Sequence, residues 1–164
     1  MGAGLVYTTF DTGIGRAGIL ASPQGLLATT LPRQSEEAVL RQLDAVTRQA
    51  TRSEQRLADV VERFRLYYHG SRVSFADELD LSGATLFQRE VWTILRSIPY
   101  GETRSYRWVA AQMGRPQAAR AVGQAVGRNP LAVVIPCHRV VTSDGRLGGF
   151  GGGLEGSGSQ ASSG

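Results

Sequence analysis

Start and stop signals for helices follow one another closely between residues 85 and 128, and they constrain the fold more than any other feature of the sequence. Thr85-x-x-Gln88 fits a capping box, in which two side chains satisfy amide groups at a helix start. The helix that begins here has one apolar face and is ended by Pro99. That face consists of Phe87, Val91, Ile94, Leu95 and Ile98.

A second helix follows over residues 106–113, with Ser105 as its cap and Gly114 as its stop. Pro116 is then expected at the first position of a third helix, over 116–128. Two helices joined by a short turn that contains glycine are typical of a helix-turn-helix.

The first half of the chain predicts an antiparallel meander of three strands, over residues 5–10, 17–21 and 26–31, separated by turns rich in glycine. Helical spacing of apolar residues over 36–49 and 57–68 predicts two amphipathic helices that cover this sheet. Their inward residues are Val39, Leu43 and Val46, and Leu57, Val60, Val61, Phe64 and Tyr68. His69 is expected at a helix end, as a favourable partner of the helix dipole.

The remaining segments complete an α+β fold. An apolar strand is expected over 131–135, and residues 140–142 with a turn at 143–145 fit the wing of a winged helix. We therefore expect a small amino-terminal α/β lobe (antiparallel sheet plus helices) over 1–83 and a winged helix-turn-helix lobe over 84–154. The Gly/Ser-rich residues 155–164 read as a flexible tail.

Charge is divided unevenly between the two lobes. Residues 1–83 carry nine Arg and ten acidic residues, whereas residues 84–150 carry nine Arg against three acidic residues, a balance of +6. A basic surface of this kind is expected where a protein meets phosphate. A solvated, arginine-rich surface is an equal alternative at this point.

The single cysteine, Cys137, excludes an internal disulfide, and with only two histidines it excludes an ordinary four-ligand zinc site. No structural metal is therefore expected. A lone cysteine is more commonly a small buried residue than a nucleophile, so a reactive role depends on its context. The absence of a long apolar run or a signal peptide predicts an intracellular protein, cytoplasmic or nuclear, that is neither secreted nor bound to a membrane. A monomer is expected.

The expected helix over 116–128 is unusually rich in small residues. It offers few long polar side chains to read bases, but small residues allow close approach to a narrow groove, and Arg120 can reach between bases. An alanine-rich core helix is the alternative. The small residues are Ala118, Ala119, Ala121 and Gly123.

These motifs together resemble the O6-alkylguanine-DNA alkyltransferases, also called methylated-DNA-protein-cysteine methyltransferases. The resemblance spans about residues 84–154, and the amino-terminal lobe is similar only in its pattern of elements. It rests on Pro136-Cys137-His138-Arg139-Val140-Val141, Asn129-Pro130, Ala119-Arg120-Ala121-Val122-Gly123, Ile98-Pro99-Tyr100-Gly101-Glu102-Thr103, Ser105-Tyr106 and the glycine loop through Phe150.

The resemblance implies a reaction in which Cys137 accepts the alkyl group of O6-alkylguanine, and also of O4-alkylthymine, once per molecule and without a cofactor. His138 would remove the thiol proton, through a water because neighbours in an extended segment point to opposite sides. Tyr106 would give a proton to the departing guanine. Asn129 would hold the turn near the thiol, although a helix cap or turn role suits Asn-Pro equally well.

The resemblance also implies that the partner is double-stranded DNA, bound in the minor groove by the third helix and Tyr106. The target nucleotide would be extruded and Arg120 would fill its place. The helix residues implied in DNA binding are Ala118, Ala119, Arg120, Ala121 and Gly123, and those implied in lining the substrate pocket are Pro136, Val140, Phe150 and Gly151.

The sequence departs from the family pattern after the glycine loop. The family's last helix, with a glutamate that orients the histidine, has no counterpart, since Glu155 comes too early. Slower transfer and lower stability are expected from this. Three classes of function remain open: an alkyltransferase, a protein that binds alkylated DNA with little or no transfer, and a winged-helix regulator with a structural Cys137.

Overall fold

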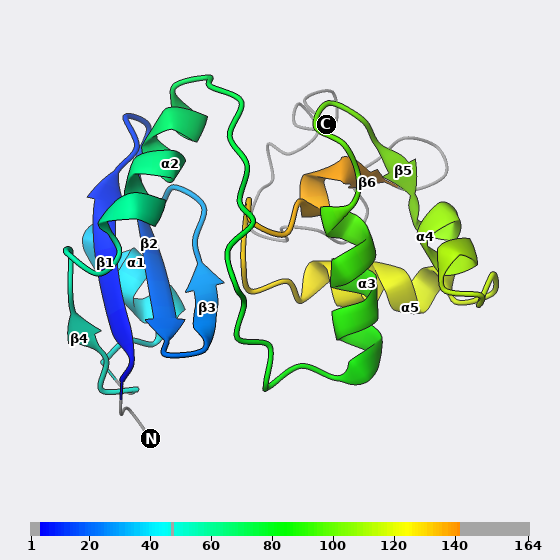
Figure 1. The fold of residues 1–164 in the computed structure, drawn as a ribbon, viewed down its shortest axis with the longest axis horizontal. Coiled ribbons are helices and arrows are strands. Elements are labelled where there is room, and N and C mark those ends of the chain that lie inside the picture. Colours follow the sequence, from blue (N-terminus) through cyan, green and yellow to red (C-terminus); the bar gives the residue numbers. More distant parts are fainter. Residues whose placement is uncertain (1–3, 47, 142–164) are drawn as a thin grey trace. The chain divides into compact units, whose positions relative to one another are not determined.

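The computed structural model describes residues 4–46 and 48–141 of the chain (Figure 1). Contacts between Cα atoms divide the chain into two compact units. The first is Met1–Ser82 with Pro130–Val134, and the second is Gly83–Asn129 with Ile135–Gly164. Within the described residues, no helix is long and apolar enough to cross a membrane.

The first unit contains the expected meander. Strands β1 (Val6–Asp11), β2 (Arg16–Ser22) and β3 (Gly25–Thr29) pair antiparallel in the order β3-β2-β1. A short strand without a sequence signal, β4 (Thr51–Arg52), extends the sheet and runs parallel to β1. The sheet and the helices of the two units together confirm the α+β class.

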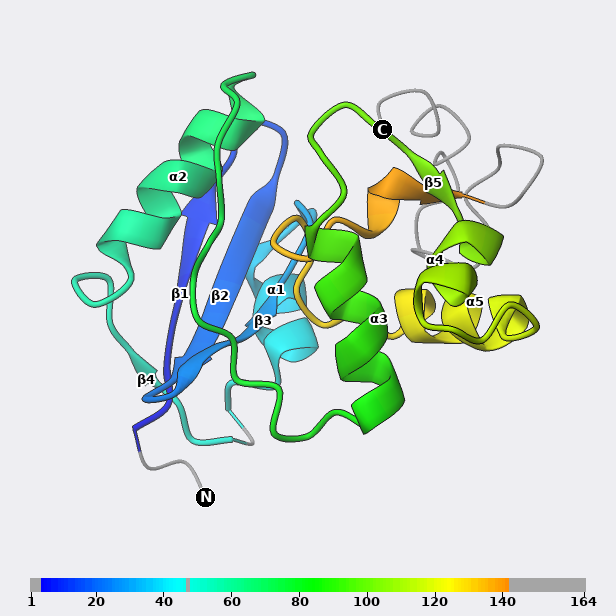
Figure 2. The ribbon, with the colours of Figure 1, turned by 45° about the vertical axis from the view of Figure 1, so that its right-hand side comes forward.

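Helices cover both faces of this sheet, as Figures 1 and 2 show for α1 (Glu36–Leu43) and α2 (Ala58–Tyr68). Gly18 permits the close approach of α1, because a Cβ there would lie 2.4 Å from Val39. On the opposite face the ring of Phe64 in α2 packs 5.7 Å from that of Phe10. Alternation along the strands puts these contacts on separate faces.

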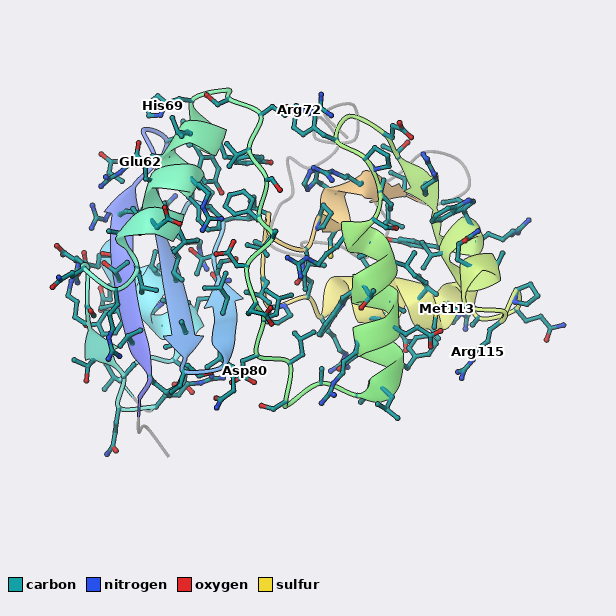
Figure 3. The ribbon with its side chains drawn as sticks, in the orientation of Figure 1. Glu62, His69, Arg72, Asp80, Met113 and Arg115 are labelled. Carbon is teal, nitrogen blue, oxygen red and sulfur yellow. The ribbon has the colours of Figure 1, made fainter. Side chains whose placement is uncertain are left out.

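Helices α1 and α2 end at a left-handed residue and at a histidine, respectively. The helix expected over 36–49 ends at Leu43, because Asp44 adopts a left-handed conformation with φ 58° and its N–H closes the last turn. The prediction that Val46 faces the core was therefore wrong, since this side chain is 82% exposed. His69 caps α2, and its Nδ1 lies 2.8 Å from the carbonyl oxygen of Arg65 (Figure 3).

The second unit begins with α3 (Leu86–Arg96), and both bonds of its capping box are present at 3.0 Å. Helices α4 (Tyr106–Gln112) and α5 (Ala119–Gly127) form the helix-turn-helix, with Met113 and Arg115 in the turn between them (Figure 3). The predicted caps of α3 and α4 are confirmed, as Ser105 Oγ accepts from the N–H of Trp108.

The core of this unit lies where α3 crosses α5 (Figure 1). The buried indole of Trp92 in α3 donates from Nε1 to the carbonyl oxygen of Ala125 in α5 at 2.9 Å. The fully buried apolar side chains around this crossing are Val91, Leu95, Val109, Val122 and Val126.

Two expected elements differ in the structure. Pro116 does not begin α5, because a turn closed by the N–H of Ala118 and the carbonyl of Arg115 precedes the helix. Residues 131–135 form isolated bridges in place of a strand, and Val133 has φ 75°, a strained value for a β-branched residue.

Thr29 of β3 holds this segment by two hydrogen bonds. Its N–H donates to the carbonyl of Pro130 at 2.9 Å, and its hydroxyl donates to the carbonyl of Ala132 at 2.6 Å. The carbonyls of Pro130 and Ala132 are thus engaged by Thr29, within the first unit to which the segment belongs. Such a pairing depends on residues about a hundred positions away, so no local pattern predicts it.

The chain then forms a 3₁₀ turn, η1 (Cys137–Arg139), and β6 (Val140–Val141), which pairs parallel with β5 (Arg104–Ser105). The extended conformation expected around Cys137 was therefore wrong. The turn at 143–145, Phe150, Gly151 and the Gly/Ser-rich tail lie outside the described residues.

Candidate active site around Cys137

The thiol of Cys137 lies at the start of η1 and is 1% exposed. The side-chain amide of Asn129 donates from Nδ2 to the sulfur at 2.9 Å, and the thiol donates to the carbonyl oxygen of Val126 at 3.4 Å. The sulfur is thus held on two sides by the end of α5.

Asn129 also organises the backbone of this region. Its Nδ2 donates to the carbonyl of Ile135 at 2.9 Å, and its own N–H donates to the carbonyl of Val126 at 3.3 Å. The first bond joins the two ends of the segment Pro130–Val134. One side chain therefore serves as a turn residue and as a partner of the thiol, the two alternatives that the sequence left open.

The environment of the thiol opposes its ionisation. Burial raises the pKa of Cys137 to about 12, and the hydrogen bond from Asn129 offsets only part of this effect. At neutral pH the sulfur carries its proton, so a nucleophilic role requires a base when substrate is present.

His138 is the neighbouring candidate base. Burial, together with the positive charge of Arg139, lowers the pKa of His138 to about 4, so the imidazole is neutral and able to accept a proton. Within the described residues no hydrogen bond joins the imidazole to the Cys137 thiol. This agrees with the expectation that adjacent side chains need not touch, although η1 is not extended.

Tyr106 is the first residue of α4, and its hydroxyl oxygen is buried. The ring lies against α5 at Gly123, where a Cβ would be 3.2 Å from Cε2 of the tyrosine. Glycine at this position therefore allows the ring to pack close to the helix backbone. Among the described residues, no hydrogen bond joins Tyr106 to Cys137.

Helix α5 has two different sides. Val122, Ala125 and Val126 are buried in the core, whereas Arg120 and Ala121 are exposed. The helix is thus a core helix that also presents a surface of small residues with one long cation. The other residues expected on that surface, Ala118, Ala119 and Gly123, are half-buried.

The residues expected to line a pocket are only partly described. Pro136 and Val140 are both buried and flank η1. Phe150 and Gly151 lie outside the described residues. Among residues 4–46 and 48–141, no group of three or more His, Cys, Asp or Glu side chains could hold a metal ion.

Two interactions in this region were not predicted from the sequence, one of the Val126 carbonyl and one of the Arg139 guanidinium. The acceptor on Val126 is a backbone carbonyl, which has no sequence signal. Arg139 belongs to the Pro-Cys-His-Arg motif, and its guanidinium donates from Nη1 to the carbonyl of Ile98 at 2.7 Å. A charged residue directly after a candidate base could have drawn attention to it.

Comparison with known proteins adds a family description to this geometry. Residues 86–159 match the family model described as 6-O-methylguanine DNA methyltransferase, DNA binding domain. The chain is 47% identical over 138 residues to the methylated-DNA–protein-cysteine methyltransferase of Mycolicibacterium paratuberculosis, with 82% of each protein covered. It is 55% identical over 97 residues to that of Mycobacterium leprae, covering 59% of this chain and 58% of the relative.

A solved structure is similar over both units. It is the crystal structure of Mycobacterium tuberculosis OGT in complex with DNA, with a TM-score of 0.73 and 38% identity. The similarity covers 89% of this chain and 84% of that one.

Proposed function

Since this chain belongs to the methylated-DNA–protein-cysteine methyltransferase family, we propose that it repairs O6-alkylguanine in DNA by transferring the alkyl group to Cys137. The observation that carries the proposal is the held thiol. Asn129 donates a hydrogen bond to the sulfur and the Val126 carbonyl accepts one from the thiol, at the end of the helix-turn-helix that would meet DNA. A structural cysteine would need neither partner.

In the transfer step the sulfur attacks the alkyl carbon bound to O6 of guanine. A sulfur–carbon bond forms while the carbon–oxygen bond breaks, and its electron pair goes to the base. The thiol proton leaves through a water to His138, which is neutral at pH 7 because its pKa is lowered to about 4. The thioether is inert, so each molecule reacts once and needs no cofactor.

The hydrogen bond from Asn129 gives a further reason for reaction at this sulfur. A donor directed at sulfur stabilises the thiolate more than the thiol, and it opposes the effect of burial on the pKa of Cys137. The departing guanine gains its proton from Tyr106, whose place against α5 is fixed by Gly123.

The DNA partner is bound through the exposed side of α5 and the turn before it. A target base has to leave the duplex, at a cost of a few kcal/mol, before the buried sulfur can reach its alkyl group. Arg120, exposed on the side of small residues, fills the vacated space in the minor groove. Burial of Cys137 then protects the thiol from other electrophiles.

Gly123→Ala is expected to slow transfer roughly 3- to 10-fold, less than the ~100-fold that a 1 Å misplacement can cost. The added methyl group would press on the Tyr106 ring at 3.2 Å and displace it by a few tenths of an ångström. The rate is measured with free O6-benzylguanine, so that DNA binding does not enter. Gly127→Ala, an exposed position of the same helix, should react at the parent rate. A parent-like rate for Gly123→Ala would show that the ring's position is unimportant.

The proposed function is tested by intact mass spectrometry after incubation with a duplex that carries one O6-methylguanine. The mass should rise by one methylene group, at one group per molecule, and peptide mapping should place it on Cys137. Binding to the lesion without a mass change would favour a lesion-binding protein. Binding that ignores the lesion and depends on sequence would favour a regulator.

A further inference from the structure

Arg139 closes η1 and also reaches beyond it. Its N–H donates to the carbonyl of Pro136 at 3.0 Å, which closes the turn that carries Cys137 and His138. Its guanidinium donates from Nη1 to the carbonyl of Ile98 at 2.7 Å and lies 5.6 Å from the centroid of the Tyr100 ring. The backbone of Arg139 thus closes the turn, and its side chain connects the turn to the segment that follows α3.

That segment is well suited to hold a cation. Ile98 is 2% exposed and comes two residues after the last helical residue of α3, where carbonyl groups lack partners within a helix. Arginine side chains commonly satisfy such carbonyls and interact favourably with the helix dipole. The aromatic face of Tyr100 adds a cation–π contact on the solvent side.

We propose that Arg139 is a positioning residue for the reaction, which fastens the turn bearing Cys137 and His138 to the end of α3. The inference rests on the proposed alkyl transfer at Cys137. A 3₁₀ turn of three residues has few hydrogen bonds of its own, so an external anchor is needed to fix the direction of its side chains.

The charge of Arg139 has a second effect on the same turn. It lies next to His138 and adds to burial in lowering the pKa of the imidazole. On the neighbouring segment that leads into β5, the charged groups are Glu102 and Arg104, which form an ion pair with each other at 2.6 Å. Arg139 is therefore the charge that disfavours protonation of His138 most directly.

Two substitutions separate the anchor from the charge. Arg139→Lys keeps the charge but loses the planar, forked donor that reaches the Ile98 carbonyl and stacks on Tyr100. Arg139→Met keeps a side chain of similar length but loses both the charge and the hydrogen-bond donors. Arg63→Met is the matched control, because Arg63 lies 5.6 Å from the ring of Phe75 in the first unit and is ion-paired with Asp77.

The first measurement is the rate of Cys137 alkylation by free O6-benzylguanine between pH 4 and pH 8. Both Arg139 variants should lose about 10- to 100-fold of the parent's rate on the plateau. With Arg139→Met the acid limb should also move to higher pH, since protonated His138 cannot act as the base. Arg139→Lys should keep the limb of the parent.

The second measurement is the titration of His138 by NMR in a His69→Gln background, where only one histidine remains. The pKa of His138 should rise toward its ordinary value with Arg139→Met, and stay low with Arg139→Lys and Arg63→Met. Thermal unfolding of every variant shows whether it is folded at the temperature of the assay.

Parent-like rates and an unchanged His138 titration in both Arg139 variants would overturn the inference. Equal losses with Arg63→Met would also overturn it, because the effect would then be one of stability alone. If the parent chain reacts neither with O6-benzylguanine nor with the duplex that carries O6-methylguanine, the proposed function fails at Cys137, and the titration still decides whether Arg139 governs His138.

Discussion

Cys137→Ala is expected to abolish alkyl uptake completely while leaving recognition of the alkylated duplex close to that of the parent. The substitution removes the sulfur that would form the new bond, and no other cysteine exists in the chain. Asn129 keeps its bond to the Ile135 carbonyl, so the frame of the turn survives. The cost in stability should be on the order of 1 kcal/mol. Intact mass and electrophoretic mobility shift measure the two properties.

Cys137→Ser is the sharper control for this result. A hydroxyl can replace the thiol between Asn129 and the Val126 carbonyl, yet it ionises far less readily in a buried site. The serine variant should therefore also fail to gain mass. Residual transfer in either variant would place the acceptor elsewhere in the chain and refute the role of Cys137.

Trp92→Ala is expected to lower the free energy of unfolding by about 3–5 kcal/mol, the usual cost of emptying a large buried aromatic site. The indole is 3% exposed and joins α3 to α5 through its bond to the Ala125 carbonyl. Trp92→Phe isolates the bond from Nε1 to the Ala125 carbonyl. It should cost only about 1 kcal/mol, because the N–H of Arg128 still donates to that carbonyl.

Urea unfolding followed by circular dichroism measures both variants, with Trp108→Phe as the control. Trp108 is half-buried and contacts Arg104 through its ring, so its replacement should change stability much less. If Trp92→Ala and Trp108→Phe had equal effects, the crossing of α3 and α5 would not be the centre of this unit's core.

Sequence reasoning succeeded where the deciding interaction is local. The capping box of Thr85 and Gln88 and the Ser105 cap use residues three positions apart, so the starts of α3 and α4 could be predicted. The prediction was wrong where a backbone conformation sets the end of a helix, as Asp44 does for α1, and where a distant residue decides the conformation of a segment. The expected strand over 131–135 is the clearest case, because Val133 has φ 75° and the Ala132 carbonyl is held by Thr29, about a hundred positions away.

In the candidate site, too, only the features that depend on residue type could be predicted from the sequence. The motifs identified Asn129 as a residue beside the thiol, and its bond to the sulfur agrees with this, whereas the roles of His138 and Tyr106 stay predictions. The conformation of the turn could not be predicted, since a 3₁₀ turn of three residues leaves no periodic signal. Nor could the Val126 carbonyl, whose place depends on how α5 ends, or the reach of Arg139 to Ile98.

The segment Pro130–Val134 belongs to the first unit although its neighbours in the sequence belong to the second, and this affects the order of folding. The chain leaves the second unit at Asn129, is bonded to Thr29, and re-enters at Ile135, directly before the reactive turn. Closing a loop of about a hundred residues is slow compared with forming a hairpin or a helix. We therefore expect the setting of Cys137 to be completed late in folding, after the meander exists. A fragment that begins at Gly83 would contain the nucleophile and both helices of the helix-turn-helix. It would lack β3, whose Thr29 holds the segment Pro130–Val134 just before that nucleophile.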